Sequence, residues 1–179
     1  MLWSRIARAT AALSLAALAL SACTSTTPIP TVDQTQTAYL NPELAPRPLE
    51  PLSEATATGE ATRIADALAA LIDASTVVAV TDQSQLVPAD DDIAAYYVAY
   101  RTYVLDPSVD PQTLAEALGA VLAQSGWIEH GTTNEDGVLI VALSGGTDEQ
   151  PWFMFVQGET AVEGQPAISI QIAGPDLQA

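Results

Sequence analysis

Apolar residues in two segments of the chain recur at the spacing of one face of a helix. The first segment predicts a helix from about Gly59 to Asp73, with Thr58 as its N-cap. The second has clearer boundaries, because Asp110 is a capping residue, Pro111 suits the first helical position and Gly126 lies just past the end. The apolar positions are Ile64, Leu68, Leu71 and Ile72 in the first segment, and Leu114, Leu118, Val121 and Leu122 in the second.

Shorter runs rich in β-branched and aromatic residues predict strands. Two of these runs flank Asn134-Glu135-Asp136-Gly137, a sequence that favours a hairpin turn. The order α-β-β-α-β-β-β-β predicts an α+β fold, in which two helices pack on one face of a mainly antiparallel sheet of about five to six strands. The expected strands are 76–80, 94–105, 127–130, 138–143, 152–156 and 167–172.

The predicted strand 94–105 carries tyrosines whose side chains must alternate between the two faces of the sheet. Tyr96 and Tyr100 share one face. Tyr97 and Tyr103 share the other, so one pair is expected on the face that the helices leave open. Such a face would bind a partner protein or an apolar ligand, whereas aromatic residues under the helices would fill the core. The candidate residues for a docking face are Tyr96, Tyr100, Tyr97, Tyr103 and Trp152.

The beginning of the chain has the pattern of a secretory signal peptide. Arg5 and Arg8 precede an apolar run from Ala11 to Leu20, which is too short for a membrane-spanning helix of about 20 residues. The run closes on Leu20-Ser21-Ala22-Cys23, which holds the one cysteine of the chain. An ordinary secretory signal cleaved after Ala22 is the alternative interpretation.

The four residues from Leu20 to Cys23 resemble the lipobox of bacterial lipoproteins. In that family the cysteine receives a diacylglyceryl group and becomes the first residue of the mature chain. The resemblance covers residues 1–23 alone. It implies a protein held by lipid at Cys23 on the outer, extracytoplasmic face of the cell membrane. The alanine-rich, lysine-free composition is typical of a high-GC bacterium and, with the lipobox, suggests a small actinobacterial envelope lipoprotein.

Between this motif and the first predicted helix the chain is rich in proline and threonine and shows no apolar period. Such a composition cannot bury enough apolar surface to fold, so we predict a disordered tether. The expected organisation is a signal peptide at 1–22, lipidated Cys23 with its tether at 23–57, one α+β domain at 58–174 and a short tail at 175–179.

The charge of the chain is strongly negative. Five arginines and no lysine stand against 22 acidic residues, a formal net charge of −17 at pH 7. Removal of Arg5 and Arg8 with the signal peptide leaves three arginines and a charge of −19. Nucleic-acid binding requires Lys and Arg to neutralise phosphates, so this class of partner is excluded. Attachment to anionic headgroups is also disfavoured, which leaves the lipid as the means of membrane attachment.

Residues for catalysis or metal binding are scarce. His130 is the one histidine, Cys23 is reserved for lipid, and we expect no catalytic set, metal or cofactor. The run Asp90-Asp91-Asp92 lacks the calcium-loop pattern and is interpreted as a solvated loop, with a weak calcium site as the alternative.

The function most consistent with these features is that of a lipid-anchored envelope protein with a non-catalytic binding or accessory domain. The alternatives are a cell-envelope hydrolase that uses paired carboxylates, whose spacing a sequence does not reveal, and a purely structural spacer.

Overall fold

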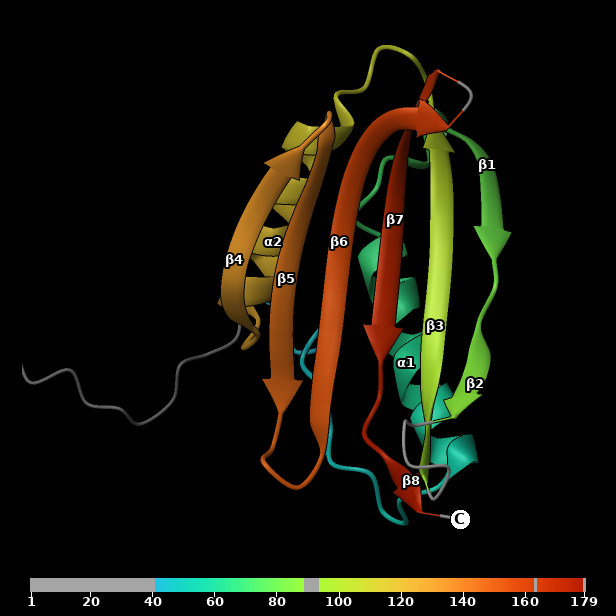
Figure 1. Cartoon of the computed structure of the whole chain (residues 1–179), viewed down its shortest axis with the longest axis vertical. Coiled ribbons are helices and arrows are strands. Elements are labelled where there is room, and N and C mark those ends of the chain that lie inside the picture. The colour runs from blue at the N-terminus through green and yellow to red at the C-terminus, as the bar shows by residue number, and fades with distance from the viewer. Residues whose placement is uncertain (1–40, 89–93, 163, 179) are drawn as a thin grey trace, which may run out of the picture. The chain divides into compact units, whose positions relative to one another are not determined.

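Strands of the described chain form one antiparallel sheet, and both helices lie on the same side of it (Figure 1). The computed structural model describes residues 41–88, 94–162 and 164–178. The predicted signal peptide, Cys23 and the run Asp90-Asp91-Asp92 lie outside the described residues. The elements are α1 (Glu54–Ala69), β1 (Val77–Asp82), β2 (Gln85–Pro88), β3 (Ala94–Leu105), α2 (Pro111–Gln124), β4 (Ile128–Glu135), β5 (Val138–Gly146), β6 (Pro151–Val162), β7 (Gln165–Ala173) and β8 (Leu177–Gln178), with a 3-10 turn at Ala74–Thr76.

The strands follow the order β1-β3-β7-β6-β5-β4, and β2 and β8 pair with further parts of β3. The α+β class and the antiparallel sheet are therefore confirmed. The sheet is larger than expected, because its described part has eight strands and the element order is α-β-β-β-α-β-β-β-β-β. The prediction missed β2, a short and mostly exposed strand, and β8, which has two residues.

The core lies between the helices and one face of the sheet. Helix α1 packs on β3 and β7, and α2 packs mainly on β5 and β6. Alternate residues of the two central strands face the helices and are buried. These residues are Trp152, Met154 and Val156 on β6 and Ile168, Ile170 and Ile172 on β7; they meet Ile64 and Leu68 of α1 and Leu118 and Leu122 of α2 in one apolar cluster.

The first helix begins earlier than the sequence predicts. Its N-cap is Ser53, whose hydroxyl accepts a hydrogen bond from the Thr56 backbone while the Thr56 side chain accepts one from Ser53 N. This reciprocal pair satisfies two backbone donors of the first turn. Thr58, the expected cap, lies inside α1.

The expected domain boundary at residue 58 is corrected in the same region. Leu44 and Leu49 are buried in the core, so the described chain packs from residue 41 onward. The indole Nε1 of Trp127 donates to the backbone oxygen of Leu44 over 2.8 Å. Gln150 exchanges two hydrogen bonds with the backbone of Leu49. Residues 41–53, here called the N-terminal segment, therefore belong to the domain and not to a tether.

Two local predictions are confirmed. Asp110 caps α2 by accepting from the backbone of Gln112 and Thr113, and Pro111 is the first helical residue. Asp136 and Gly137 have φ angles of 52° and 82°, the left-handed pair that a tight two-residue hairpin requires.

Gly158 and Gly59 provide a matched test of how closely α2 approaches the sheet. A Cβ at Gly158 would collide with the backbone of Pro111, whose carbonyl carbon is 2.6 Å away, whereas one at Gly59 meets nothing within 4 Å. We expect Gly158→Ala to lower the free energy of unfolding by about 1–3 kcal/mol, because α2 must move off β6. Gly59→Ala, in the middle of α1, should raise it by up to about 1 kcal/mol. Chemical denaturation measures both values, and two effects of the same sign would contradict this packing.

Candidate functional site

The face of the sheet turned away from α1 and α2, here called the outer face, carries large exposed apolar side chains. Phe153 and Phe155 of β6 are 47 % and 41 % exposed. They alternate with buried residues of the same strand, because successive side chains of a strand point to opposite faces. In the described chain both helices pack on the other face of the sheet, where the buried residues of β6 lie.

The tyrosines of β3 divide between the two faces as alternation requires. Tyr96 and Tyr100 lie on the outer face together with Val98 and are half-buried. Tyr103 is buried in the core at 5 % exposure, and Tyr97 packs against that core. Of the two predicted pairs, Tyr96 and Tyr100 form the outer one.

Trp152 does not belong to the outer face, which corrects the prediction. It is fully buried under the helices, on the side of β6 where Met154 pairs with Ile172. Its Nε1 has no hydrogen-bond partner among the described residues, so packing alone accounts for its position. The exposed aromatic residues of β6 are its neighbours Phe153 and Phe155. The sequence alternation separates these two sets but does not reveal which of them the helices cover.

A groove opens on the outer face where β2, β3 and β7 meet. It has a volume of about 260 Å³. Val98 is only 7 % exposed although it belongs to the outer face, because taller neighbours surround it. The lining residues of this β2–β3 groove are Gln83, Gln85, Val87, Tyr96, Val98, Tyr100 and Gln171.

Strand register connects the groove to the exposed phenylalanines. Gln171 of β7 pairs with Tyr100 on one side and with Phe155 on the other. Ala173 stands in the same way between Val98 and Phe153. Neighbouring strands are about 4.8 Å apart, so the rings of β3 and β6 flank a row about 10 Å wide. Within this row, the short Ala173 side chain lies between Val98 and Phe153.

The outer face carries no charge over its central rows. These central rows of paired residues run across the sheet. One bounding row contains the pair Thr133 and Ile140, and the other contains the pair Ile128 and Ser144. In these rows and between them, no described residue of the outer face is Asp, Glu, Lys or Arg. Its polar groups are hydroxyls, amides and the His130 imidazole, and they include a 3.0 Å hydrogen bond between Thr102 and Ser169. This neutrality is notable on a chain with a formal charge of −17.

One wall of the groove depends on Asp82, at the corner between β1 and β2. Its Oδ1 accepts from the backbone and the hydroxyl of Ser84, and its Oδ2 accepts from Arg101 Nε at 2.8 Å. The hydrogen bond from the Ser84 hydroxyl, followed by that from Arg101, lowers the pKa of Asp82 to about 2. Arg101 also reaches Asp66 of α1 at 2.5 Å. The corner that carries Gln83 and Gln85 is thereby fixed to the helix layer.

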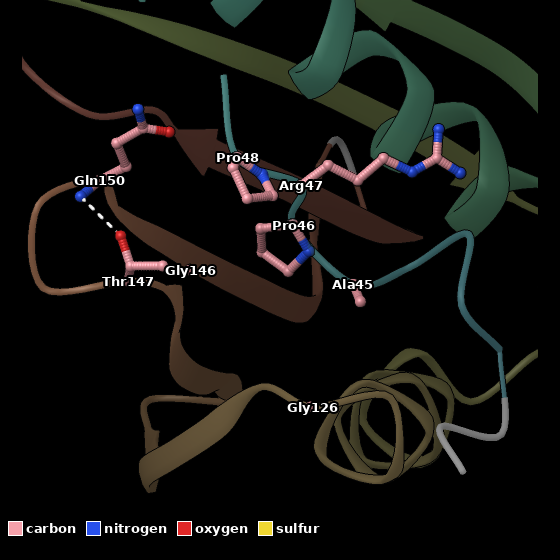
Figure 2. A pocket seen from close by; sticks show the side chains of 8 residues that line it. All are labelled: Ala45, Pro46, Arg47, Pro48, Gly126, Gly146, Thr147 and Gln150. Carbon is pink, nitrogen blue, oxygen red and sulfur yellow. Dashed lines mark hydrogen bonds between the residues drawn. The ribbon is translucent and has the colours of Figure 1, made fainter. Parts of the chain in front are cut away.

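A second, smaller pocket lies beside the N-terminal segment. Figure 2 shows its lining, which comes from that segment and from the ends of α2, β5 and the following loop. Its volume is about 130 Å³, and one hydrogen bond of 3.2 Å joins Gln150 N to the Thr147 hydroxyl at its edge. The lining residues are Ala45, Pro46, Arg47, Pro48, Gly126, Gly146, Thr147 and Gln150.

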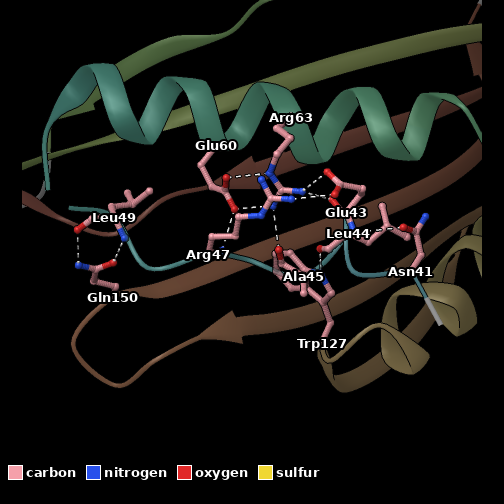
Figure 3. A network of polar contacts seen from close by, with 10 residues as sticks. All are labelled: Asn41, Glu43, Leu44, Ala45, Arg47, Leu49, Glu60, Arg63, Trp127 and Gln150. Atoms are coloured by element: carbon pink, nitrogen blue, oxygen red, sulfur yellow. Dashed lines mark hydrogen bonds and ion pairs between the residues drawn. The ribbon is translucent and has the colours of Figure 1, made fainter. Parts of the chain in front are cut away.

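Arg63 and Glu60 of α1 hold the N-terminal segment in place (Figure 3). The Arg63 guanidinium bonds both oxygens of Glu60, at 2.5 and 2.8 Å, and the backbone oxygens of Glu43 and Ala45. Glu60 also accepts from Arg47 N at 2.7 Å. Burial alone would raise the pKa of Glu60, but the hydrogen bonds from Arg63 and from the Arg47 backbone lower it overall. This network is structural, because its charges are already paired.

The structure brings His130 and Ser144 together on the outer face, where His130 Nε2 lies 2.7 Å from Ser144 Oγ. A histidine bonded to a serine is the beginning of a nucleophile–base arrangement. No hydrogen bond found among the described residues joins this imidazole to a carboxylate, and both side chains lie outside the β2–β3 groove. Among the described residues, the pair is thus joined to no carboxylate and lies apart from the groove.

Metal ligands and membrane-spanning helices were sought in the described part of the chain. There, no group of three or more His, Cys, Asp or Glu side chains is placed to hold a metal ion. No described helix has the length and apolar character needed to cross a bilayer.

Comparison with known proteins gave no relative: no protein-family model matches the chain, and neither a curated protein nor a solved structure is similar to it.

The contribution of Asp82 to the groove wall predicts a pH dependence. Because the folded pKa of about 2 lies below the unfolded value of about 4, the ionised carboxylate stabilises the fold above pH 4, and this stabilisation is lost as the pH falls from 4 to 2. The Asp82 side chain is 45 % exposed, so we expect Asp82→Asn to cost only about 1 kcal/mol at pH 6. Denaturation of both proteins from pH 6 to pH 2 should show the difference disappear; a constant difference would contradict the role of the carboxylate.

Proposed function

We propose that this protein is a lipid-anchored, extracytoplasmic envelope protein whose α+β domain is a non-catalytic binding module. The binding role is supported by the outer face. There the helices of the described chain leave four aromatic side chains uncovered, those of Tyr96, Tyr100, Phe153 and Phe155. Exposed apolar patches on a folded domain mark interaction sites. The anchor rests on the lipobox-like sequence that ends at Cys23.

A hydrolytic role receives no support from the groove. Glycoside hydrolysis needs two carboxyl groups that flank the bond to be cleaved. The seven described lining residues of the β2–β3 groove include none. The second pocket has one charged lining residue, Arg47, whose guanidinium is 2.8 Å from Glu43. Binding is therefore the function that the described cavities support best.

Substitution of Cys23 tests the anchor. Cys23→Ser cannot form the thioether to a diacylglyceryl group, so the variant should be released to the medium or remain unprocessed. Cell fractionation and mass measurement of the purified chain distinguish these results from the wild type. Recovery of the variant in the membrane fraction at the wild-type size would show that lipid at this residue is not the anchor.

The two tyrosine pairs of β3 test the binding face with matched substitutions. Tyr96→Ala with Tyr100→Ala should abolish crosslinking to envelope components while changing the unfolding free energy little, because both rings are partly exposed. Tyr97→Ala with Tyr103→Ala should instead lower the unfolding free energy by about 3 kcal/mol or more, because Tyr103 is buried. Crosslinking in intact envelopes and denaturation give the two readouts. If both double variants only lose stability, the outer face has no docking role.

A further inference from the structure

The polar groups of the β2–β3 groove are all of the kind that both donate and accept hydrogen bonds. Gln83, Gln85 and Gln171 each present an amide with two N–H donors and a carbonyl acceptor. Tyr96 and Tyr100 each present a hydroxyl group. A ligand that satisfies these groups must itself offer donors and acceptors at short intervals, as a hydroxyl-rich molecule does. A purely apolar ligand would leave the amides it covers without partners, which costs free energy.

The charge pattern further narrows the ligand class. The chain carries a formal charge of −17, so an anionic ligand approaches against the field of the whole protein. A cationic ligand would find carboxylates over much of the chain but none among the groove's described lining residues. The groove therefore favours an uncharged ligand over either kind of ion.

The aromatic residues supply the apolar part of recognition. Aromatic rings are large, flat surfaces with a large apolar contact area, and tyrosine adds a polar tip. A sugar ring has the matching shape, because its C–H groups form an apolar face and its hydroxyls project from the edge. Tyr96 and Tyr100 line one side of the groove. Across the row of Gln171 and Ala173 stand Phe155 and Phe153, which extend the surface for a longer chain.

We propose that the β2–β3 groove, extended by Phe153 and Phe155, binds an uncharged carbohydrate chain. The groove volume of about 260 Å³ lies just below the range of about 300–1,000 Å³ of small-molecule sites, which suits a short stretch of a polysaccharide. This inference deepens the proposed binding function and rests on it, since it names the ligand class of the same outer face.

Defined oligosaccharides test the ligand class. The purified full chain is titrated with neutral oligomers of glucose, mannose, galactose and arabinose, each of about four to six units, up to about 10 mM. Oligogalacturonate and chitosan oligomers provide the anionic and cationic comparisons, and a fatty acid provides the apolar one. Backbone amide shifts in NMR spectra locate the site, and calorimetry gives the dissociation constant. We expect at least one neutral series to bind and to shift residues of β2, β3 and β7.

Two substitutions of the same chemistry provide the matched control. Gln171→Glu places a carboxylate in the groove and removes two donors with almost no change of shape. It should weaken binding of the neutral oligomer by about tenfold or more. Gln124→Glu adds the same charge at the exposed end of α2, in the layer on the other side of the sheet, and should leave the affinity unchanged. Circular dichroism confirms that both variants are folded.

Four results would overturn the inference. They are the absence of binding by every neutral series, equal or tighter binding of a charged oligomer or the fatty acid, equal effects of Gln171→Glu and Gln124→Glu, and amide shifts confined to other parts of the domain. If the tyrosine variants Tyr96→Ala and Tyr100→Ala still abolish envelope crosslinking while no neutral oligomer binds, the docking function stands and the carbohydrate class is wrong. If crosslinking persists as well, both are wrong.

Discussion

The position of both helices on one face of the sheet is the constraint on which the rest of this structure depends. Because strand side chains alternate, each central strand has one row packed under a helix and one row turned away. Ile170 is therefore buried in the core, while the adjacent Ser169 bonds Thr102 on the outer face. Phe153 is exposed, whereas its chain neighbours Trp152 and Met154 are both buried. The proposed binding face would arise from this geometry without any dedicated loop or insertion.

The arginines of the described chain connect segments of the domain through ion pairs. Arg47 and Arg63 pair with Glu43 and Glu60 around the N-terminal segment, and Arg101 joins β3 to α1 and to the β1–β2 corner. Exposed ion pairs contribute little free energy, so their effect is mainly to fix segments relative to one another. These three arginines thus form ion pairs within the domain, and acidic side chains dominate the remaining charged surface. Against this background, the neutral central rows of the outer face are a local exception, and depletion of charge is typical of the centre of an interface.

The sequence predicted structure best where residues close together in the chain determine the backbone geometry. The capping of α2 by Asp110 and the hairpin at Gly137 follow from backbone geometry that only a few residues satisfy. The N-terminal segment was missed because Leu44 and Leu49 are isolated apolar residues without a period, and their burial depends on Trp127 and Gln150, far away in sequence. The exposed residues of β6 were misassigned because that strand is apolar on both faces.

A lipid anchor would raise the fraction of a weak binding face that is occupied by ligand. With lipid at Cys23, the domain is confined to a thin layer above the membrane, where a neighbouring polymer is present at an effective concentration of about millimolar. A groove with a dissociation constant of the same order would then be half occupied, although it would be empty in dilute solution. Anionic headgroups would repel the acidic surface, which would disfavour adhesion of the domain to the bilayer. In the proposed arrangement, the anchor would supply concentration, the charge would keep the outer face accessible, and the neutral groove would supply selectivity.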